Sequence, residues 1–140
     1  MGGKLDMRAF FDGFTTLGQP LSMAAMLMRI CVAVVIGAVI GIDREIKNRP
    51  AGMRTHVLVC VGAALVSLIE CHAVADAVAL GSAAVGVSIG RITTSVVSGV
   101  GFLGAGTIFM SDRKISGLTT AASLWCTACI GLAPRARSCW

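Results

Sequence analysis

The sequence has no tyrosine and few charged residues. Aromatic residues make up 5% of the chain and charged residues 14%. Surfaces that bind nucleic acids interleave aromatic with basic side chains, so we expect no nucleic-acid partner despite the net charge of +5. Hydrophobic residues reach 56% and the mean hydropathy is +0.85, more than a soluble core of this size requires. The composition therefore predicts a protein solvated by lipid.

Charged side chains are missing altogether from several long windows of the chain. No Asp, Glu, Lys or Arg occurs in 30–42, 55–69, 77–90, 92–111 or 115–134. A helix needs roughly 20 apolar residues to cross a hydrocarbon layer about 30 Å thick, and two of the windows reach that length. We predict an all-α, polytopic transmembrane helical bundle of about four spans, at about 21–42, 55–71, 92–110 and 118–133. The apolar segment 77–90 is rich in small residues and is expected to be either re-entrant or a short helix.

The remaining segments predict the domain organisation and the topology. Residues 1–20 are expected to be an N-terminal tail or interfacial segment, 21–133 the transmembrane domain, and 134–140 an atypical C-terminal tail. Basic residues gather in the linker 43–56 and in the turn 111–117. The positive-inside rule then places both of these loops in the cytoplasm, although basic residues near the two ends of the chain oppose this orientation.

Patterns typical of catalysis or of cofactor binding are absent or out of context. Residues 99–104 spell GxGxxG, but the motif lies inside a charge-free window, without the strand and the acidic residue of a dinucleotide site. Cys126 and Cys129 form a CxxC that has no second ligand pair at zinc spacing, so packing is the preferred interpretation. We expect no enzyme activity and no cofactor, and the sequence identifies no metal site.

Small and hydroxyl-bearing residues line the third and fourth predicted spans. The set comprises Gly99, Gly101, Gly104, Gly106, Ser95 and Ser98 in the third span, with Thr119 and Thr120 in the fourth. Such residues allow close packing of helices, and they also suit the wall of a narrow polar path. The sequence leaves both interpretations open. Gly37 and Gly41 form a GxxxG in the first span, which predicts the close approach of another helix.

The charged linker is the strongest functional candidate. Its residues are Asp43, Arg44, Glu45, Arg49 and Arg54. An interfacial anchor is the alternative, but acids at the C-terminus of a helix oppose its dipole, and a violated local rule often marks a functional site. Pairs spaced i,i+4, Asp43 with Lys47 and Glu45 with Arg49, predict that the helix continues to about Asn48.

Three blocks of the sequence resemble the MgtC/SapB family. They are Gly41-Ile-Asp-Arg-Glu45 with Arg49-Pro-Ala-Gly-Met-Arg-Thr-His56, then Val97-Ser-Gly-Val-Gly-Phe-Leu-Gly-Ala-Gly-Thr-Ile108, and Gly117-Leu-Thr-Thr-Ala-Ala-Ser-Leu-Trp125. The chain departs from the family pattern where Asp43 replaces a usual Glu and Ser95 a usual Gln. Family members commonly carry a fifth span, and the tail from Pro134 does not resemble theirs, which predicts a truncated or frame-altered C-terminus.

The resemblance implies a bacterial inner-membrane protein linked to growth at low magnesium and to survival inside macrophages. It implies a non-enzymatic regulator or accessory factor, with partners such as the ATP synthase or a magnesium transporter and with homo-oligomers as an open alternative. In this interpretation the charged linker engages a partner at the cytoplasmic face. The rival interpretation is a transporter or channel for magnesium or another small solute, with Glu70 or Asp76 at its mouth.

Overall fold

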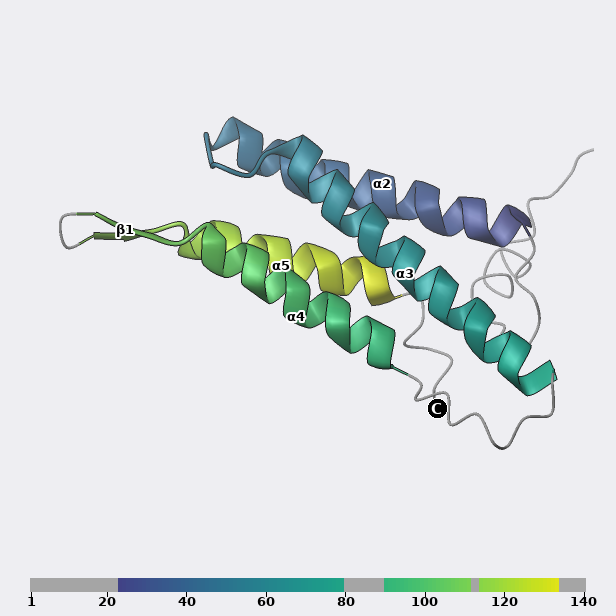
Figure 1. The fold of residues 1–140 in the computed structure, drawn as a ribbon. Helices are drawn as coiled ribbons and strands as arrows, with labels where there is room; N and C mark the ends of the chain where they lie inside the picture. Colours follow the sequence, from purple (N-terminus) through teal and green to yellow (C-terminus); the bar gives the residue numbers. More distant parts are fainter. Residues whose placement is uncertain (1–22, 80–89, 112–113, 134–140) are drawn as a thin grey trace, which may run out of the picture.

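Four helices and a short hairpin make up the described part of the chain. The computed structural model describes residues 23–79, 90–111 and 114–133. In chain order the elements are α2 (Met23–Ile46), α3 (Met53–Ala79), α4 (Arg91–Gly106), β1 (Phe109–Ser111), β2 (Lys114–Ser116) and α5 (Leu118–Leu132). The helices lie lengthwise beside one another, and each runs opposite to the one before it (Figure 1). The predicted all-α fold class is confirmed.

The helices differ in whether their length suffices to cross a bilayer. Helices α2 and α3 contain 24 and 27 residues and are apolar enough to span it. Helices α4 and α5 contain 16 and 15 residues, fewer than the roughly 20 that a perpendicular span requires. Among the described residues two helices therefore meet the criterion for a span, and the number of four spans stays a prediction.

Three predicted boundaries differ from the observed ones. Helix α3 continues past the predicted end at Cys71 and includes Glu70, His72 and Asp76. Helix α2 ends at Ile46, two residues before the predicted end, and α4 ends at Gly106 because the chain turns there into the hairpin. Of the segment predicted to be re-entrant or a short helix, residues 77–79 belong to α3 and 80–89 lie outside the described residues. The predicted terminal segments, 1–20 and 134–140, lie outside them too.

Large apolar side chains face outward, and small or polar residues lie inside. Phe102, Leu58 and Val39 are 81%, 72% and 64% exposed. Four larger apolar residues are buried, namely Leu68, Val100, Leu124 and Leu132. Most other buried positions are occupied by alanines, glycines and polar residues, among them Arg29, His56, Ser67, Glu70, Thr120 and Thr127. Water would penalise this arrangement, whereas lipid solvates the apolar exterior and favours burial of the polar groups.

Glycines set the distance between α2 and α3. A Cβ atom added to Gly37 would lie 2.8 Å from Cα of Val57, and one added to Gly41 would overlap Cα of Met53. The predicted close approach of another helix at this GxxxG is confirmed, with α3 as the neighbour. Because no side chain separates the two backbones, α2 and α3 form a tight antiparallel pair at the end of the bundle that carries the linker (Figure 1).

A hairpin joins α4 to α5 at that same end. Strands β1 and β2 pair antiparallel, with Met110 opposite Ile115. Gly117 then adopts φ +90°, and a Cβ atom there would overlap the carbonyl oxygen of Thr107. Only glycine fits both this backbone conformation and this contact. The predicted polar turn at 111–117 is thus part of a hairpin that extends beyond the helices (Figure 1).

Candidate functional site

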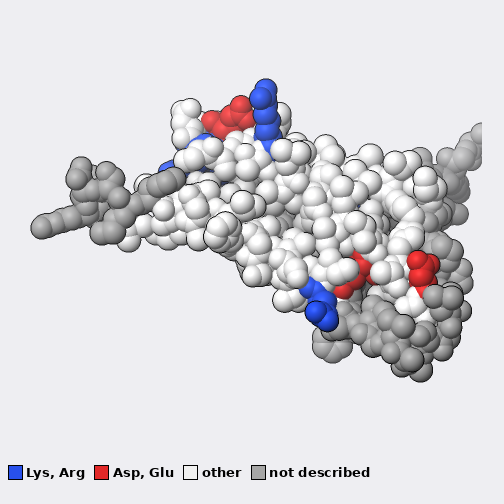
Figure 2. Space-filling model, viewed as in Figure 1, with Lys and Arg blue, Asp and Glu red and all other residues white. Residues whose placement is uncertain are grey.

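The linker between α2 and α3 gathers the predicted charged residues at one end of the bundle. After α2 ends, Asn48 takes φ 49° and the Arg49 amide donates to the Arg44 carbonyl at 3.0 Å. This sharp turn brings Arg49 and the start of α3 back beside the end of α2. Figure 2 shows acidic and basic atoms grouped there, separated by a largely uncharged surface from a second group near the other end.

The two linker acids hold local structure. The Lys47 ammonium lies 2.7 Å from the Asp43 carboxylate, so the predicted i,i+4 pair is confirmed. The predicted pair between Glu45 and Arg49 is wrong, because α2 ends at Ile46 and the helical spacing that would align them is lost. The Glu45 carboxylate instead accepts the backbone N–H of Met53 at 3.2 Å. It thereby satisfies a free amide at the N-terminus of α3.

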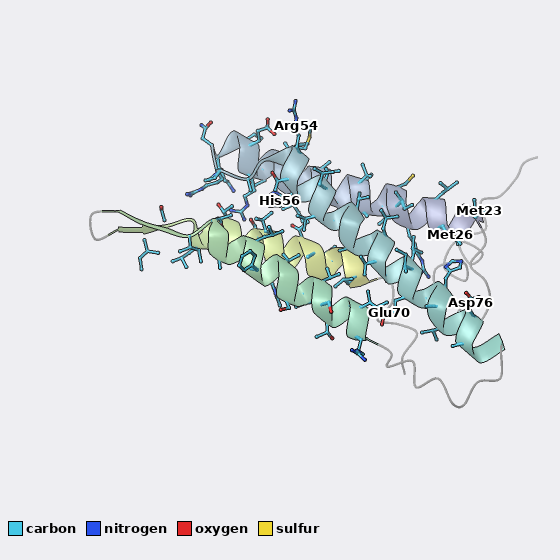
Figure 3. All side chains as sticks on the ribbon, viewed as in Figure 1. Met23, Met26, Arg54, His56, Glu70 and Asp76 are labelled. Atoms are coloured by element: carbon cyan, nitrogen blue, oxygen red, sulfur yellow. The ribbon has the colours of Figure 1, made fainter. Side chains whose placement is uncertain are left out.

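The linker carries four basic side chains against two acids, so a net charge of +2 remains there. Arg44 is half-buried, whereas Arg49 and Arg54 are exposed (Arg54 is labelled in Figure 3). Within the part of the chain that the structure describes, none of the three forms an ion pair, and the buried Nε of Arg44 has no hydrogen-bond partner. The linker end therefore presents an excess of positive charge that is available to an anionic surface.

Just inside the linker, a buried polar contact joins α3 to α5. His56 is fully buried, and its Nε2 lies 3.1 Å from Oγ of Ser123, 67 positions away in the sequence. Its Nδ1 lies 2.9 Å from the carbonyl oxygen of Gly52, at the end of the linker. Oγ of Ser123 also lies 2.9 Å from the carbonyl oxygen of Thr120. This network fixes the linker against the first turns of α5.

At the opposite end of the bundle, Glu70 caps α4. Its carboxylate is 2% exposed and accepts the backbone N–H of Thr93 at 3.2 Å, the N–H of Gly90 and the hydroxyl of Thr93. Gly90 is the N-cap of α4 and has no side chain of its own to perform this role. Glu70 thus lies in the interior, whereas Asp76 is exposed two turns further along α3 (Figure 3).

The predicted small-residue face of α4 makes few contacts with the other described residues. Of its four glycines only Gly104 is buried, with a Cβ position 3.4 Å from Cβ of Ala121 on α5. Gly99, Gly101 and Gly106 meet no atom of the described residues within 4 Å. The other members divide in the same way, since Ser95, Ser98 and Thr119 are exposed and Thr120 is buried. The structure therefore brings Thr120 to the buried network near His56 and leaves the α4 face open.

Sequence reasoning missed the capping glutamates and the histidine contact. Gly52 and Gly90 precede α3 and α4 where a Ser, Thr, Asp or Asn would normally cap the helix, and that gap was the available signal for an acid from elsewhere. Nothing in the sequence reveals that His56 contacts Ser123, because the pairing depends on how α3 and α5 pack.

Comparison with known proteins shows which family and which proteins the chain is similar to. The model of the MgtC family matches residues 30–139. "Putative magnesium transporter YhiD" of Escherichia coli K12 is 41% identical over 109 residues, covering 78% of this chain and 50% of that protein. "Protein MgtC" of Salmonella typhimurium LT2 is 40% identical over 114 residues, covering 81% and 45%. An uncharacterized Synechocystis protein, slr0014, is 40% identical over 105 residues, covering 75% and 41%.

The matched region contains the whole described bundle apart from the first turns of α2. No solved structure matches the chain. The chain spans about half the length of the curated relatives it matches. Together with two apolar helices of membrane-spanning length, the match makes this a membrane protein. The chain belongs to the MgtC family.

Proposed function

We propose that this protein is a non-enzymatic membrane regulator or accessory factor in magnesium homeostasis that binds a partner through its linker end. The observation that carries the proposal is the charge imbalance there. Asp43 is paired with Lys47 and Glu45 is held at the start of α3, so Arg44, Arg49 and Arg54 outnumber the remaining acid and leave a net charge of +2 for an external anionic group. In this proposal the linker and the hairpin face the cytoplasm of a bacterium, at the inner membrane, as their basic residues favour.

The partner is proposed to be another membrane protein with an acidic surface near the lipid boundary. The family resemblance points to the ATP synthase or a magnesium transporter, and to a role in intracellular survival. A second copy of the chain is a further candidate partner. Arginine suits such contacts because its guanidinium forms planar, bidentate hydrogen bonds with carboxylates.

Growth in low-magnesium medium tests the proposal. A bacterial strain lacking its own MgtC-family gene is complemented with the wild-type chain or with the Arg49→Glu, Arg54→Glu double variant. We expect the variant to insert normally and to lose complementation. The control is Arg91→Glu, the same charge reversal at one exposed arginine at the other end of the bundle, compared also with Arg49→Glu alone. Growth of the double variant at the wild-type rate would overturn the linker-binding role.

A transporter is the second candidate, because one relative carries the name of a putative magnesium transporter. The buried Glu70 is the natural carboxylate for such a path, although its oxygens already accept hydrogen bonds from Gly90 and Thr93. Magnesium flux into proteoliposomes that contain only this chain separates the two functions. The regulator requires no flux above that of empty vesicles, whereas the transporter requires flux that Glu70→Gln reduces.

A further inference from the structure

The hydrogen-bond contacts of His56 and Ser123 outnumber the hydrogen atoms that a neutral imidazole and a hydroxyl can donate. His56 is 0% exposed, and its Nδ1 lies 2.9 Å from the carbonyl oxygen of Gly52. A carbonyl oxygen only accepts hydrogen bonds, so this contact is a hydrogen bond when Nδ1 carries the ring hydrogen. In the neutral ring Nε2 is then a bare acceptor that faces Oγ of Ser123 at 3.1 Å.

The serine hydroxyl has one hydrogen and two acceptors beside it. Oγ of Ser123 lies 2.9 Å from the carbonyl oxygen of Thr120 and 3.1 Å from Nε2 of His56. When the hydrogen points to either acceptor, the other contact becomes two facing lone pairs at hydrogen-bond distance. A proton on Nε2 removes the conflict, because Nε2–H donates to Ser123 and the Ser123 hydroxyl donates to Thr120.

We propose that His56 and Ser123 form a proton-binding site, in which a proton on Nε2 completes a chain of hydrogen bonds from Gly52 to Thr120. The occupied site fastens the linker end of α3 to α5, and loss of the proton weakens that attachment. The inference goes beyond the proposed regulatory role, since it makes the geometry of the linker responsive to pH.

Some charged groups around the site favour a positive charge on the His56 ring, and others oppose it. The Glu45 carboxylate lies beside the turn that holds Nδ1, 3.3 Å from the Cβ position of Gly52, and it favours a cationic ring. Arg44 at the end of α2 and Arg54 in the first turn of α3 oppose it. Asp43 and Lys47 compensate each other. The other charged or titratable groups on these elements lie further along the helices: Arg29 on α2, and Glu70, His72 and Asp76 on α3. The remaining ionisable groups are the thiols of Cys31 on α2, Cys60 and Cys71 on α3, and Cys126 and Cys129 on α5.

His72 provides an internal control for the site. Its Nδ1 lies 3.1 Å from the carbonyl oxygen of Leu68, the same i−4 contact that His56 makes. Among the described residues its Nε2 has no hydroxyl partner. The chain contains two histidines in all, so both can be followed without interference from others. A difference between them isolates the contribution of Ser123.

The test is ¹⁵N NMR of the full chain, labelled at histidine, in lipid nanodiscs between about pH 5 and pH 9. His72→Gln assigns the two sets of signals. We expect His56 to carry its hydrogen on Nδ1 at alkaline pH and to become doubly protonated on acidification. Once Nε2 is protonated, its signal should show a hydrogen bond to an oxygen, and Ser123→Ala should remove that signature while leaving the signals of His72 unchanged.

Two results would overturn the site. One is a hydrogen on Nε2 of His56 at alkaline pH, and the other is a hydrogen-bond signature of Nε2–H that Ser123→Ala does not alter. The first measurement needs no substitution at the site, so it decides the matter even when Ser123→Ala fails to insert. Amide hydrogen exchange of residues 52–60, corrected for the intrinsic pH dependence of exchange, reports the attachment itself. The protection of these amides should rise as His56 becomes protonated in the wild-type chain and not in His56→Gln.

Discussion

At the scale of single residues, the close spacing of α2 and α3 depends on glycines, which have no Cβ atom to separate the two helices. Gly41→Ala would place its Cβ on the backbone of Met53, which cannot move as a side chain could. We expect the variant to lose about 1–3 kcal/mol of stability, the usual cost of overpacking. The measurement is unfolding in mixed micelles, followed by circular dichroism.

The matched control for that substitution is Gly99→Ala on α4, where the added methyl meets open space. Alanine favours the helix over glycine by roughly 0.5–1 kcal/mol, so this variant should be neutral or slightly more stable. Equal destabilisation by the two substitutions would contradict the tight α2–α3 contact and would place a packing neighbour on α4.

Two replacements of Glu70 separate its role as a hydrogen-bond acceptor from that of its negative charge. Glu70→Ala leaves the amides of Gly90 and Thr93 without their acceptor inside the bundle, at a cost of about 1–3 kcal/mol. Glu70→Gln keeps an acceptor oxygen, and we expect a smaller loss. Hydrogen exchange at residues 90–94 measures the effect directly. Asp76→Asn is the control, since Asp76 is exposed on the same helix. Unchanged exchange in Glu70→Ala would show that the cap contributes nothing.

These residue contacts mark the limit of what the sequence could predict. Gly37 and Gly41 were predictable as a contact because GxxxG acts through one helix face. Asp43 with Lys47 was predictable because the helical i,i+4 spacing persists to Lys47, whose amide still donates to the Asp43 carbonyl. Glu45, Glu70 and His56 each act on another element, and their partners lie 8, 20 to 23 and 67 positions away. The sequence contains their chemistry but not those distances.

At the scale of elements, two glutamates each lie on one helix and cap the start of the next: Glu45 of α2 caps α3, and Glu70 of α3 caps α4. Replacing Glu45 by Ala should fray the first turn of α3 and cost about 1 kcal/mol or less, since the Met53 amide can turn to water. Faster hydrogen exchange at residues 53–56 checks this. Asp43→Ala removes an exposed ion pair on α2 and should leave the exchange of α3 unchanged. Equal fraying in both variants would make the linker charge, and not the cap, responsible.

The helix ends illustrate why element boundaries resisted prediction. Apolar length located all four helices, but it ended the second predicted span at the first polar residues. Helix α3 continues past Glu70 because the carboxylate is taken up by α4 and costs the helix nothing. In the other direction, Met110 looked like part of the third span, yet Gly106 and Thr107 begin the turn into a hairpin. The change from apolar to polar residues in the sequence therefore does not coincide with the ends of α3 and α4.

At the scale of the whole molecule, the alternating helices place the linker and the hairpin at one end (Figure 1). We predict that, in intact spheroplasts, a membrane-impermeant maleimide gives the same result for Lys47→Cys and Ile115→Cys, either labelling both or labelling neither. Asp76→Cys should give the opposite result. All three positions are exposed. Labelling above the wild-type background is the readout, and lysed spheroplasts provide the accessibility control. Different behaviour at positions 47 and 115 would exclude this topology.

The hairpin glycine has a mechanical consequence. With Gly117 seated on the carbonyl of Thr107, the return from α4 into α5 leaves little room for a hinge. Helix α5 also carries Ser123, which contacts the histidine beside the linker. A displacement of the strands β1 and β2 should therefore be carried through α5 to the first turns of α3, so a ligand bound to these strands would shift the linker arginines without contacting them.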